Sequence, residues 1–296
     1  MEENVITKNW YDKIYKPILI IPIIMLLFSL VYLYNFNAKN GDVIYKDVSI
    51  TGGTTVTVFD KNVNIEDLAL ELVKKFPDIE VKKFSDLRTG GQKGFFAETK
   101  ANVDEIKPAL EQYLGYKLTQ DNSSVEFSGS TLSQGFYQQL RLALIIAFVL
   151  MAIVVFLVFK TFVPSAAVIL SAFADIIMTV VVIDLLGISV SIAGVIAFLM
   201  LIGYSVDTDI LLTSRVLKRH EGKVNDRIWS AFKTGITMTL TSIVAVIISY
   251  YMTHSVSEVL GQIFFILSIG LFFDIFNTWV TNASILKWYE ERRVAR

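Results

Sequence analysis

Long apolar stretches alternate with polar segments along this chain of 296 residues. Six of the stretches approach the ~20 residues that a helix needs to cross a bilayer. Because 53% of the residues are apolar, the composition is typical of an integral membrane protein rather than a soluble domain. The pattern therefore predicts six transmembrane helices. The expected spans are residues 17–36, 142–159, 162–183, 188–212, 234–251 and 259–281.

Basic residues gather at the ends of these spans on one side of the membrane. They precede the first span, mark the short turn after the second, fill the loop after the fourth and follow the sixth. The positive-inside rule makes that side cytoplasmic. We therefore expect a multi-pass protein of the cell membrane with both termini in the cytoplasm. The residues are Lys8, Lys13, Lys16, Lys160, Arg215, Lys218, Arg219, Lys223, Arg227, Lys233, Lys287, Arg292, Arg293 and Arg296.

This topology divides the chain into a small number of units. The polar region between the first two spans must be extracytoplasmic, and the last five spans form one bundle. The expected units are a cytoplasmic tail at 1–16, a helix at 17–36, an extracytoplasmic domain at 37–139, a five-helix bundle at 140–286 with a basic cytoplasmic loop at about 213–233, and a cytoplasmic tail at 287–296.

The extracytoplasmic region alternates between strand and helix patterns. Apolar residues recur at helical spacing after Asn64, which is a plausible N-cap. The predicted order β-α-β-β-α-β is that of a ferredoxin-like α+β domain. The strands are expected at Val48–Phe59, Ile79–Leu87, Lys93–Thr99 and Ser123–Phe127, and the helices at Asn64–Phe76 and Asn102–Leu114.

A glycine pair, Gly52-Gly53, interrupts the first expected strand. Glycine pairs in strands commonly mark a bulge or a close approach of two backbones. A phosphate-binding loop is the alternative, but no helix opens directly after the pair and no Lys-Ser/Thr follows it. The pattern favours the structural interpretation.

Four carboxylates fall inside the expected spans. The third span contains Asp175, the sixth contains Asp274, and the fourth contains both Asp207 and Asp209. An Asp at the centre of a transmembrane helix costs roughly 2.5–3.5 kcal/mol on insertion scales, so such residues are candidates for function. Counted at ~1.5 Å per residue, Asp175 lies near mid-membrane and the others lie in the cytoplasmic half.

Asp207 and Asp209 project about 200° apart on an α-helix, so both cannot face one narrow pathway. Asp207 shares a helix face with Gly203, and a glycine permits close helix approach. We therefore expect Asp207 to be the inward-facing acid.

These acids have two possible roles. In the first, at least one of them relays protons or cations across the membrane. Burial disfavours the charged form of a carboxylate, so a buried acid can exchange protons near physiological pH. In the second, they are structural and pair with polar groups of neighbouring helices. The candidates for such pairing are Ser171, Thr179, Asn277, Thr237, Thr239 and Thr241.

Other chemistry finds little support in the sequence. The chain has no cysteine, which excludes disulfides, thiol chemistry and cysteine metal sites. His220 and His254 have no evident partners for a metal site or a catalytic triad. The net charge of −1 gives no indication of a nucleic-acid partner. We expect no enzyme activity, no cofactor and no metal centre.

The fourth span carries a more specific pattern, Gly203-Tyr204-Ser205-Val206-Asp207-Thr208-Asp209, with Arg215 shortly after it. This segment resembles the fourth-helix signature of the SecF family, the protein-export membrane subunits of the resistance-nodulation-division superfamily, and archaeal members in particular. The resemblance covers about Pro17–Glu291. Further segments similar to the family are Ile50–Thr54, Ala174-Asp175, Thr234–Thr241 and Phe273–Trp279.

The signature departs from the bacterial form of the family, which reads Gly-Tyr-Ser-x-Asn-Asp-Thr. An ungapped alignment places Asp207 on the Asn, Thr208 on the acidic position and Asp209 on the Thr. The resemblance thus implies that Asp207 or Asp209 substitutes for the family's acid. In the third span, Ala174 replaces the His of a His-Asp pair.

The resemblance implies a subunit that works with SecD beside the Sec translocation channel. It would assist export of unfolded secretory polypeptides, drawing on a proton or sodium gradient, with membrane lipids around it. Two rival functions remain: an exporter of small molecules or lipids from the same superfamily, and a non-conducting scaffold of the export complex. The small outer domain argues against the exporter.

Overall fold

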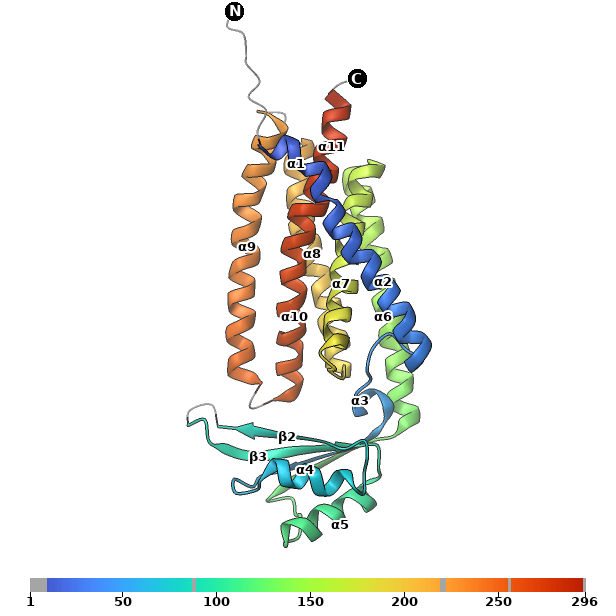
Figure 1. The fold of residues 1–296 in the computed structure, drawn as a ribbon, viewed down its shortest axis with the longest axis vertical. Coiled ribbons are helices and arrows are strands. Elements are labelled where there is room, and N and C mark those ends of the chain that lie inside the picture. The colour runs from blue at the N-terminus through green and yellow to red at the C-terminus, as the bar shows by residue number, and fades with distance from the viewer. Residues whose placement is uncertain (1–9, 87–88, 219–221, 255–256, 295–296) are drawn as a thin grey trace, which may run out of the picture.

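The structure, a computed structural model, describes residues 10–86, 89–218, 222–254 and 257–294. A bundle of long helices forms one part, and a small α+β domain lies against one end of it (Figure 1). The bundle consists of α1 (Trp10–Ile18), α2 (Ile20–Asn40), α6 (Ser130–Phe159), α7 (Phe162–Leu185), α8 (Ile192–Lys218), α9 (Val224–Thr253), α10 (Glu258–Phe276), the π-helix η1 (Asn277–Asn282) and α11 (Ala283–Val294). We call its two ends the sheet end and the α1/α11 end.

Within the described residues, six helical segments are long and apolar enough to cross a membrane. The first, Tyr11–Asn40, combines α1 and α2, and the last, Val259–Arg293, combines α10, η1 and α11. The other four segments are α6, α7, α8 and α9. The expected six-helix membrane architecture is confirmed.

Helices α8 and α9 extend much further than their apolar runs. The basic segment expected at about 213–233 is helical up to Lys218 and again from Val224, while Arg219 and His220 lie outside the described residues. The reason is packing, because apolar side chains continue at helical spacing into the basic segment. Leu212 and Val216 of α8 and Ile228 of α9 are buried together there.

The domain elements are α3 (Val48–Thr51), β1 (Gly53–Val58), α4 (Ile65–Val73), β2 (Glu80–Ser85), β3 (Gln92–Thr99), α5 (Val103–Leu114) and β4 (Ser123–Ser128). The four strands form one antiparallel sheet in the order β2-β3-β1-β4. Helices α4 and α5 cover the face that points away from the bundle (Figure 1). Apolar residues of the strands and both helices form the domain core. The ferredoxin-like arrangement is confirmed.

The expected strand over Val48–Phe59 is wrong in its first five residues, since β1 begins at Gly53. Val48–Thr51 form the short helix α3, because the Asp47 carboxylate accepts a hydrogen bond from the Ser49 backbone N–H at 2.7 Å and caps it. The glycine pair follows α3 and allows close backbone approach. An added Cβ would lie 2.4 Å from Ser130 Cα at Gly52 and 2.4 Å from the Thr99 carbonyl oxygen at Gly53.

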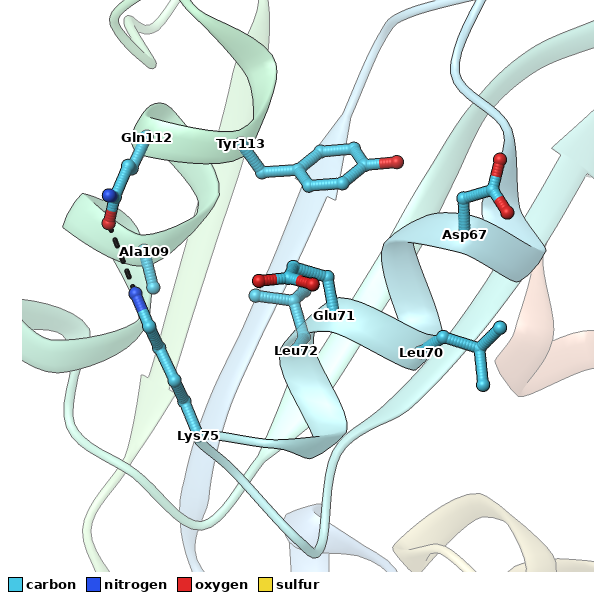
Figure 2. Close-up of a pocket in the computed structure, with 8 residues that line it drawn as sticks. All are labelled: Asp67, Leu70, Glu71, Leu72, Lys75, Ala109, Gln112 and Tyr113. Atoms are coloured by element: carbon cyan, nitrogen blue, oxygen red, sulfur yellow. Dashed lines mark hydrogen bonds between the residues drawn. The ribbon is translucent and has the colours of Figure 1, made fainter.

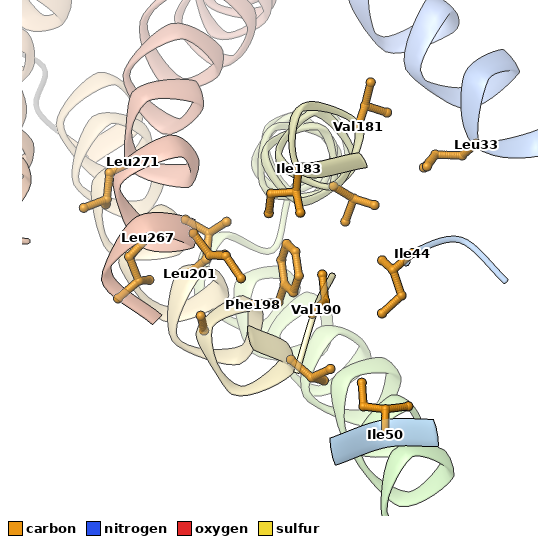
Figure 3. Close-up of a cluster of buried hydrophobic side chains, with 14 of the residues drawn as sticks. Leu33, Ile44, Ile50, Val181, Ile183, Val190, Phe198, Leu201, Leu267 and Leu271 are labelled. Atoms are coloured by element: carbon orange, nitrogen blue, oxygen red, sulfur yellow. The ribbon is translucent and has the colours of Figure 1, made fainter. Parts of the chain in front are cut away.

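A buried apolar cluster joins the domain to the bundle. Its side chains come from α2, α3, α6, α7, α8, α9 and α10 and from the segments that link α2 to α3 and α7 to α8. Those drawn in Figure 3 point toward one another. Because the cluster includes Ile44 and Ile50 on the domain side, the domain is packed onto the sheet end rather than tethered to it.

Backbone hydrogen bonds reinforce this junction. Val190, between α7 and α8, donates to the Tyr45 carbonyl at 2.7 Å and accepts from the Asp47 N–H at 3.1 Å. Gln262 of α10 holds the same segment, since it donates to the Ser189 carbonyl at 2.6 Å and accepts from Ser191. The base of the domain is therefore linked directly to α7, α8 and α10.

Candidate functional site

Three carboxylates from three helices meet inside the bundle. Asp175 of α7, Asp209 of α8 and Asp274 of α10 each have 0% of their surface exposed. Hydroxyl and amide groups of α8, α9 and η1 surround them. The structure thus brings together three of the four acids expected inside the spans, and Asp175 joins Asp209 and Asp274 although the residue count placed it deeper in the membrane.

Asp175 is held by both of its carboxylate oxygens. Ser205 of α8 donates to Oδ2 at 2.6 Å, and the Asn277 amide of η1 donates to Oδ1 at 2.7 Å. Of the residues expected as partners, Asn277 fulfils that role. Thr179 instead donates to the backbone carbonyl of Asp175 itself.

Asp209 and Asp274 share one donor. The Thr278 hydroxyl of η1 lies 2.9 Å from Asp209 Oδ1 and 3.2 Å from Asp274 Oδ1. Asn282 also donates to Asp209 Oδ1 at 2.7 Å, and Thr239 of α9 lies 3.5 Å from Asp274 Oδ2. These bonds connect the acids on α8 and α10 through η1.

The π-helix η1 explains how one short segment reaches two of the carboxylates on other helices. Its i→i+5 hydrogen bonds widen the turn, and such segments often occur at functional sites. Asn277, Thr278, Thr281 and Asn282 are all buried. Sequence reasoning missed Thr278 and Asn282, although polar pairs four residues apart within an apolar span were a signal that could have identified them.

Among the described residues, no Lys or Arg forms a salt bridge with these three acids. The buried cations lie at the α1/α11 end, where Lys287 contacts Asp12 and Glu291, and Arg227 contacts Glu290. Uncompensated charge in a low-dielectric interior is very costly. The arrangement is therefore suited to taking up protons or cations.

The expectation that Asp207 faces inward is wrong. Asp207 is exposed on the bundle surface, whereas Asp209 lies on the buried face of α8 with Ser205 and Thr213. Gly203 does not mark close packing between helices. No described atom lies within 4 Å of a Cβ placed at Gly203, so this glycine also faces outward.

The other residues of the fourth-span signature have separate roles. Tyr204 is exposed beside Asp207, and Thr208 is buried against α9, where its methyl group lies near Gly235. Arg215 ties α8 to α9 by donating to the Ser230 carbonyl at 2.6 Å and to the Ser230 hydroxyl at 3.2 Å. Arg215 is thus placed for helix packing rather than beside the acids.

Two of the threonines expected as partners lie elsewhere. Thr237 and Thr241 are exposed on α9 and donate to backbone carbonyls of their own helix. Within the described residues, no group of three or more His, Cys, Asp and Glu side chains could hold a metal ion. His254 is exposed and contacts the Tyr250 carbonyl through Nδ1.

A groove of about 560 Å³ lies between α4 and α5 on the outer surface of the domain (Figure 2). Its polar side chains are engaged locally: Lys75 donates to Gln112 at 3.1 Å, and Glu71 pairs with Lys74 at 2.7 Å. The hydrogen bond from Lys74 lowers the pKa of Glu71. These contacts stabilise the two helices, and the groove is remote from the buried acids.

Known proteins resemble the chain along nearly its whole length. Residues 110–292 match the family described as protein export membrane protein SecD/SecF, C-terminal. The protein-export membrane protein SecF of Methanocaldococcus jannaschii is 39% identical over 285 residues, which cover 94% of this chain and 96% of that protein. SecF of Methanolacinia petrolearia is 35% identical over 281 residues, 94% of each chain.

Two crystal structures of SecDF share the fold. SecDF from Thermus thermophilus, described as a translocon-associated membrane protein, matches with a TM-score of 0.73 at 18% sequence identity. SecDF in a super-membrane-facing form matches with a TM-score of 0.63 at 19% identity. These matches cover 94% and 95% of this chain but 38% and 39% of SecDF, so the chain spans well under half of that protein.

Proposed function

The chain belongs to the SecF group of the SecD/SecF protein-export membrane family, and on that basis we propose that it works with SecD beside the Sec translocation channel. Together they would assist the passage of unfolded polypeptides across the membrane, using a gradient of protons or sodium ions. The observation that carries this proposal is the cluster of Asp175, Asp209 and Asp274, buried without a paired cation among the described residues.

A gradient can act on such a cluster because neutralising a buried acid changes which helix contacts are stable. Moving one elementary charge across the membrane is worth about 2.3 kcal/mol per 100 mV. That energy is similar to the net value of one hydrogen bond to a charged group, about 1.5–3 kcal/mol. Loading or releasing one ion at Asp209 therefore supplies energy on the scale of one of its hydrogen bonds to η1, from Thr278 or from Asn282.

The contacts at the sheet end supply a route to the domain. Gln262 lies on α10, the helix that carries Asp274, and holds the segment that pairs with the base of the domain. We propose that a change at the acids shifts α10 and thereby the domain, which acts on the emerging polypeptide. The domain is extracytoplasmic in this proposal, and the α1/α11 end, with its basic residues, is cytoplasmic.

The partner surface is proposed from Asp207. An Asp exposed on a transmembrane helix costs roughly 2.5–3.5 kcal/mol near its centre on insertion scales if it faces lipid. A second membrane protein that offers a polar group to Asp207 and Tyr204 removes that cost. We assign this face of α8 to SecD.

The test is export into vesicles that contain the Sec channel and SecD with or without this chain. An imposed ion gradient is expected to increase the amount of protease-protected secretory polypeptide when the chain is present. An equal increase without the chain would contradict the proposal. If Asp175→Asn, Asp209→Asn and Asp274→Asn complexes assemble and all keep the full increase, the chain is a non-conducting scaffold.

A further inference from the structure

A pocket of about 450 Å³ lies between α1, α9 and η1 at the α1/α11 end of the bundle (Figure 1). Its volume is within the range of small-molecule and cofactor sites, about 300–1,000 Å³. Four aromatic side chains and one aliphatic side chain make up most of its lining, which suits an apolar ligand. They are Tyr11 of α1, Ile228, Trp229 and Phe232 of α9, and Trp279 of η1.

The pocket lies at a boundary of the membrane. Trp229 and Phe232 come just before the apolar run of α9 that begins at residue 234, and Trp279 lies at the end of the last apolar span, which finishes at residue 281. Trp and Tyr gather at the membrane–water interface, where their rings contact both apolar and polar surroundings. Trp229 is 57% exposed, so the pocket is open at the surface of the bundle, where lipid surrounds it.

Contacts among the aromatic rings fix the walls of the pocket. Trp229 stacks on Phe232 at a centroid distance of 5.3 Å, and Phe232 packs edge-on against Trp279 at 5.1 Å. The Nε1 of Trp279 is buried and has no hydrogen-bond partner within the described part of the chain. An indole N–H is a donor only. A ligand with an oxygen acceptor beside its apolar part therefore fits the lining.

Two exposed lysines add positive charge beside this apolar surface. Lys223 directly precedes α9, and Lys233 lies one turn after Trp229, with its Nζ 5.5 Å from the centroid of that ring. The acidic residue of the lining, Asp226, accepts a hydrogen bond from the Lys223 backbone N–H at 3.1 Å and thus caps α9. The charge balance favours a ligand with an anionic group.

A third lysine near the pocket is already paired within the protein. Lys287 lies 5.2 Å from the centroid of the Tyr11 ring. It is buried and contacts Asp12, Glu291 and Asn225. The charge offered to a ligand therefore comes from the exposed Lys223 and Lys233.

We propose that this pocket binds one anionic phospholipid. Basic pockets between transmembrane helices bind the phosphate-bearing head groups of lipids. An acyl chain lies against the aromatic rings, and the phosphate pairs with Lys233 at the exposed side of Trp229. Because Trp279 belongs to η1, the bound lipid stabilises the position of η1 against α9. This site is separate from the acid cluster and does not depend on the proposed function.

The experiment measures binding of ¹⁴C-labelled dioleoylphosphatidylglycerol to the purified full chain in complex with SecD, in micelles of a neutral detergent. We expect saturable binding that the unlabelled lipid displaces. Dioleoylphosphatidylcholine, which has the same chains without the net negative charge, should compete about fivefold less well. Glycerol phosphate, which has no chains, should not compete, and this separates a lipid from a free phosphate.

Two variants separate the apolar wall from the charge. Trp229→Ala removes an exposed wall of the pocket and should weaken the affinity for both lipids about tenfold. Lys233→Gln keeps the wall and removes one positive charge. It should weaken the affinity for dioleoylphosphatidylglycerol about fivefold and leave that for dioleoylphosphatidylcholine unchanged.

Trp288→Ala and Arg292→Gln are the matched controls. Trp288 also lies in the segment at the α1/α11 end and has a cation one turn after it, with Arg292 Cζ 4.4 Å from the ring centroid. It does not line the pocket, so both substitutions should leave lipid affinity unchanged.

Three results would overturn the proposal. The first is the absence of saturable binding to the complex, including the case in which the lipid binds only when SecD is removed, since the partner then covers the pocket. The second is an equal loss of affinity in Trp229→Ala and Trp288→Ala. The third is equal affinity of the unsubstituted complex for the two lipids.

Discussion

Substitution of Gly235 by Ala tests the packing that positions η1 against α9. A Cβ at Gly235 would lie 2.4 Å from Cζ2 and 3.0 Å from Cη2 of the Trp279 ring. Carbon atoms pack at about 3.5–4.0 Å, so the ring must move by about 1 Å. Trp279 follows Thr278 directly in η1, and its ring packs edge-on against Phe232 at a centroid distance of 5.1 Å.

The magnitude follows from two opposing effects. Overpacking of this kind costs about 1–3 kcal/mol, while Gly→Ala within a helix gains about 0.5–1 kcal/mol. We expect Gly235→Ala to lower the free energy of unfolding by about 1–2 kcal/mol. Gly203→Ala is the control, because no described atom lies within 4 Å of its Cβ position, and it should be neutral or slightly stabilising.

The assay is reversible unfolding of each purified variant in mixed micelles, followed by helix content. The two substitutions add the same methyl group to two transmembrane helices, so the difference between them isolates packing. If Gly203→Ala is destabilising and Gly235→Ala is not, α8 is rotated relative to this account, and the inward position of Asp209 is refuted.

Two further predictions concern other parts of the chain. Asn64→Ala removes the side-chain oxygen that accepts from the Glu66 and Asp67 N–H groups. This substitution should destabilise α4 by about 1 kcal/mol. Faster hydrogen exchange of the α4 amides, with no change in those of α5, would verify it. Lys287→Met leaves Asp12 and Glu291 without their buried ammonium group. This substitution should lower the free energy of unfolding by about 1–3 kcal/mol. An unchanged free energy of unfolding in the mixed-micelle assay would contradict the prediction.

Much of the fold follows from local patterns in the sequence. Six apolar runs specify six helical spans. In lipid the backbone N–H and C=O groups find no water, and a helix pairs all of them within one segment. In the domain, helical spacing of apolar residues and the cap at Asn64 identify α4. Local patterns did not predict α3 at Val48–Thr51, where a strand was expected. There the Asp47 cap outweighs the strand preference of Val and Thr.

The candidate site was only partly predictable. The sequence marks Asp175, Asp207, Asp209 and Asp274 alike as unusual, since a carboxylate in an apolar span stands out without further information. It does not reveal which face of α8 is buried, because Gly203 predicted the face of Asp207 and in the structure no described atom lies within 4 Å of the Gly203 Cβ position. The wide turn of η1 also depends on tertiary contacts, so the donors Thr278 and Asn282 became apparent only in the structure.

The central claim is that Asp209 couples an ion gradient to export, and the most direct measurement compares Asp209→Asn with Asp207→Asn. Both variants, in complexes with normal SecD content, are reconstituted with the Sec channel, and protected polypeptide is measured with and without the gradient. The account predicts that Asp209→Asn loses the gradient-dependent part of export while Asp207→Asn keeps it. Retention of that part in Asp209→Asn, with its loss in Asp207→Asn, would contradict the account.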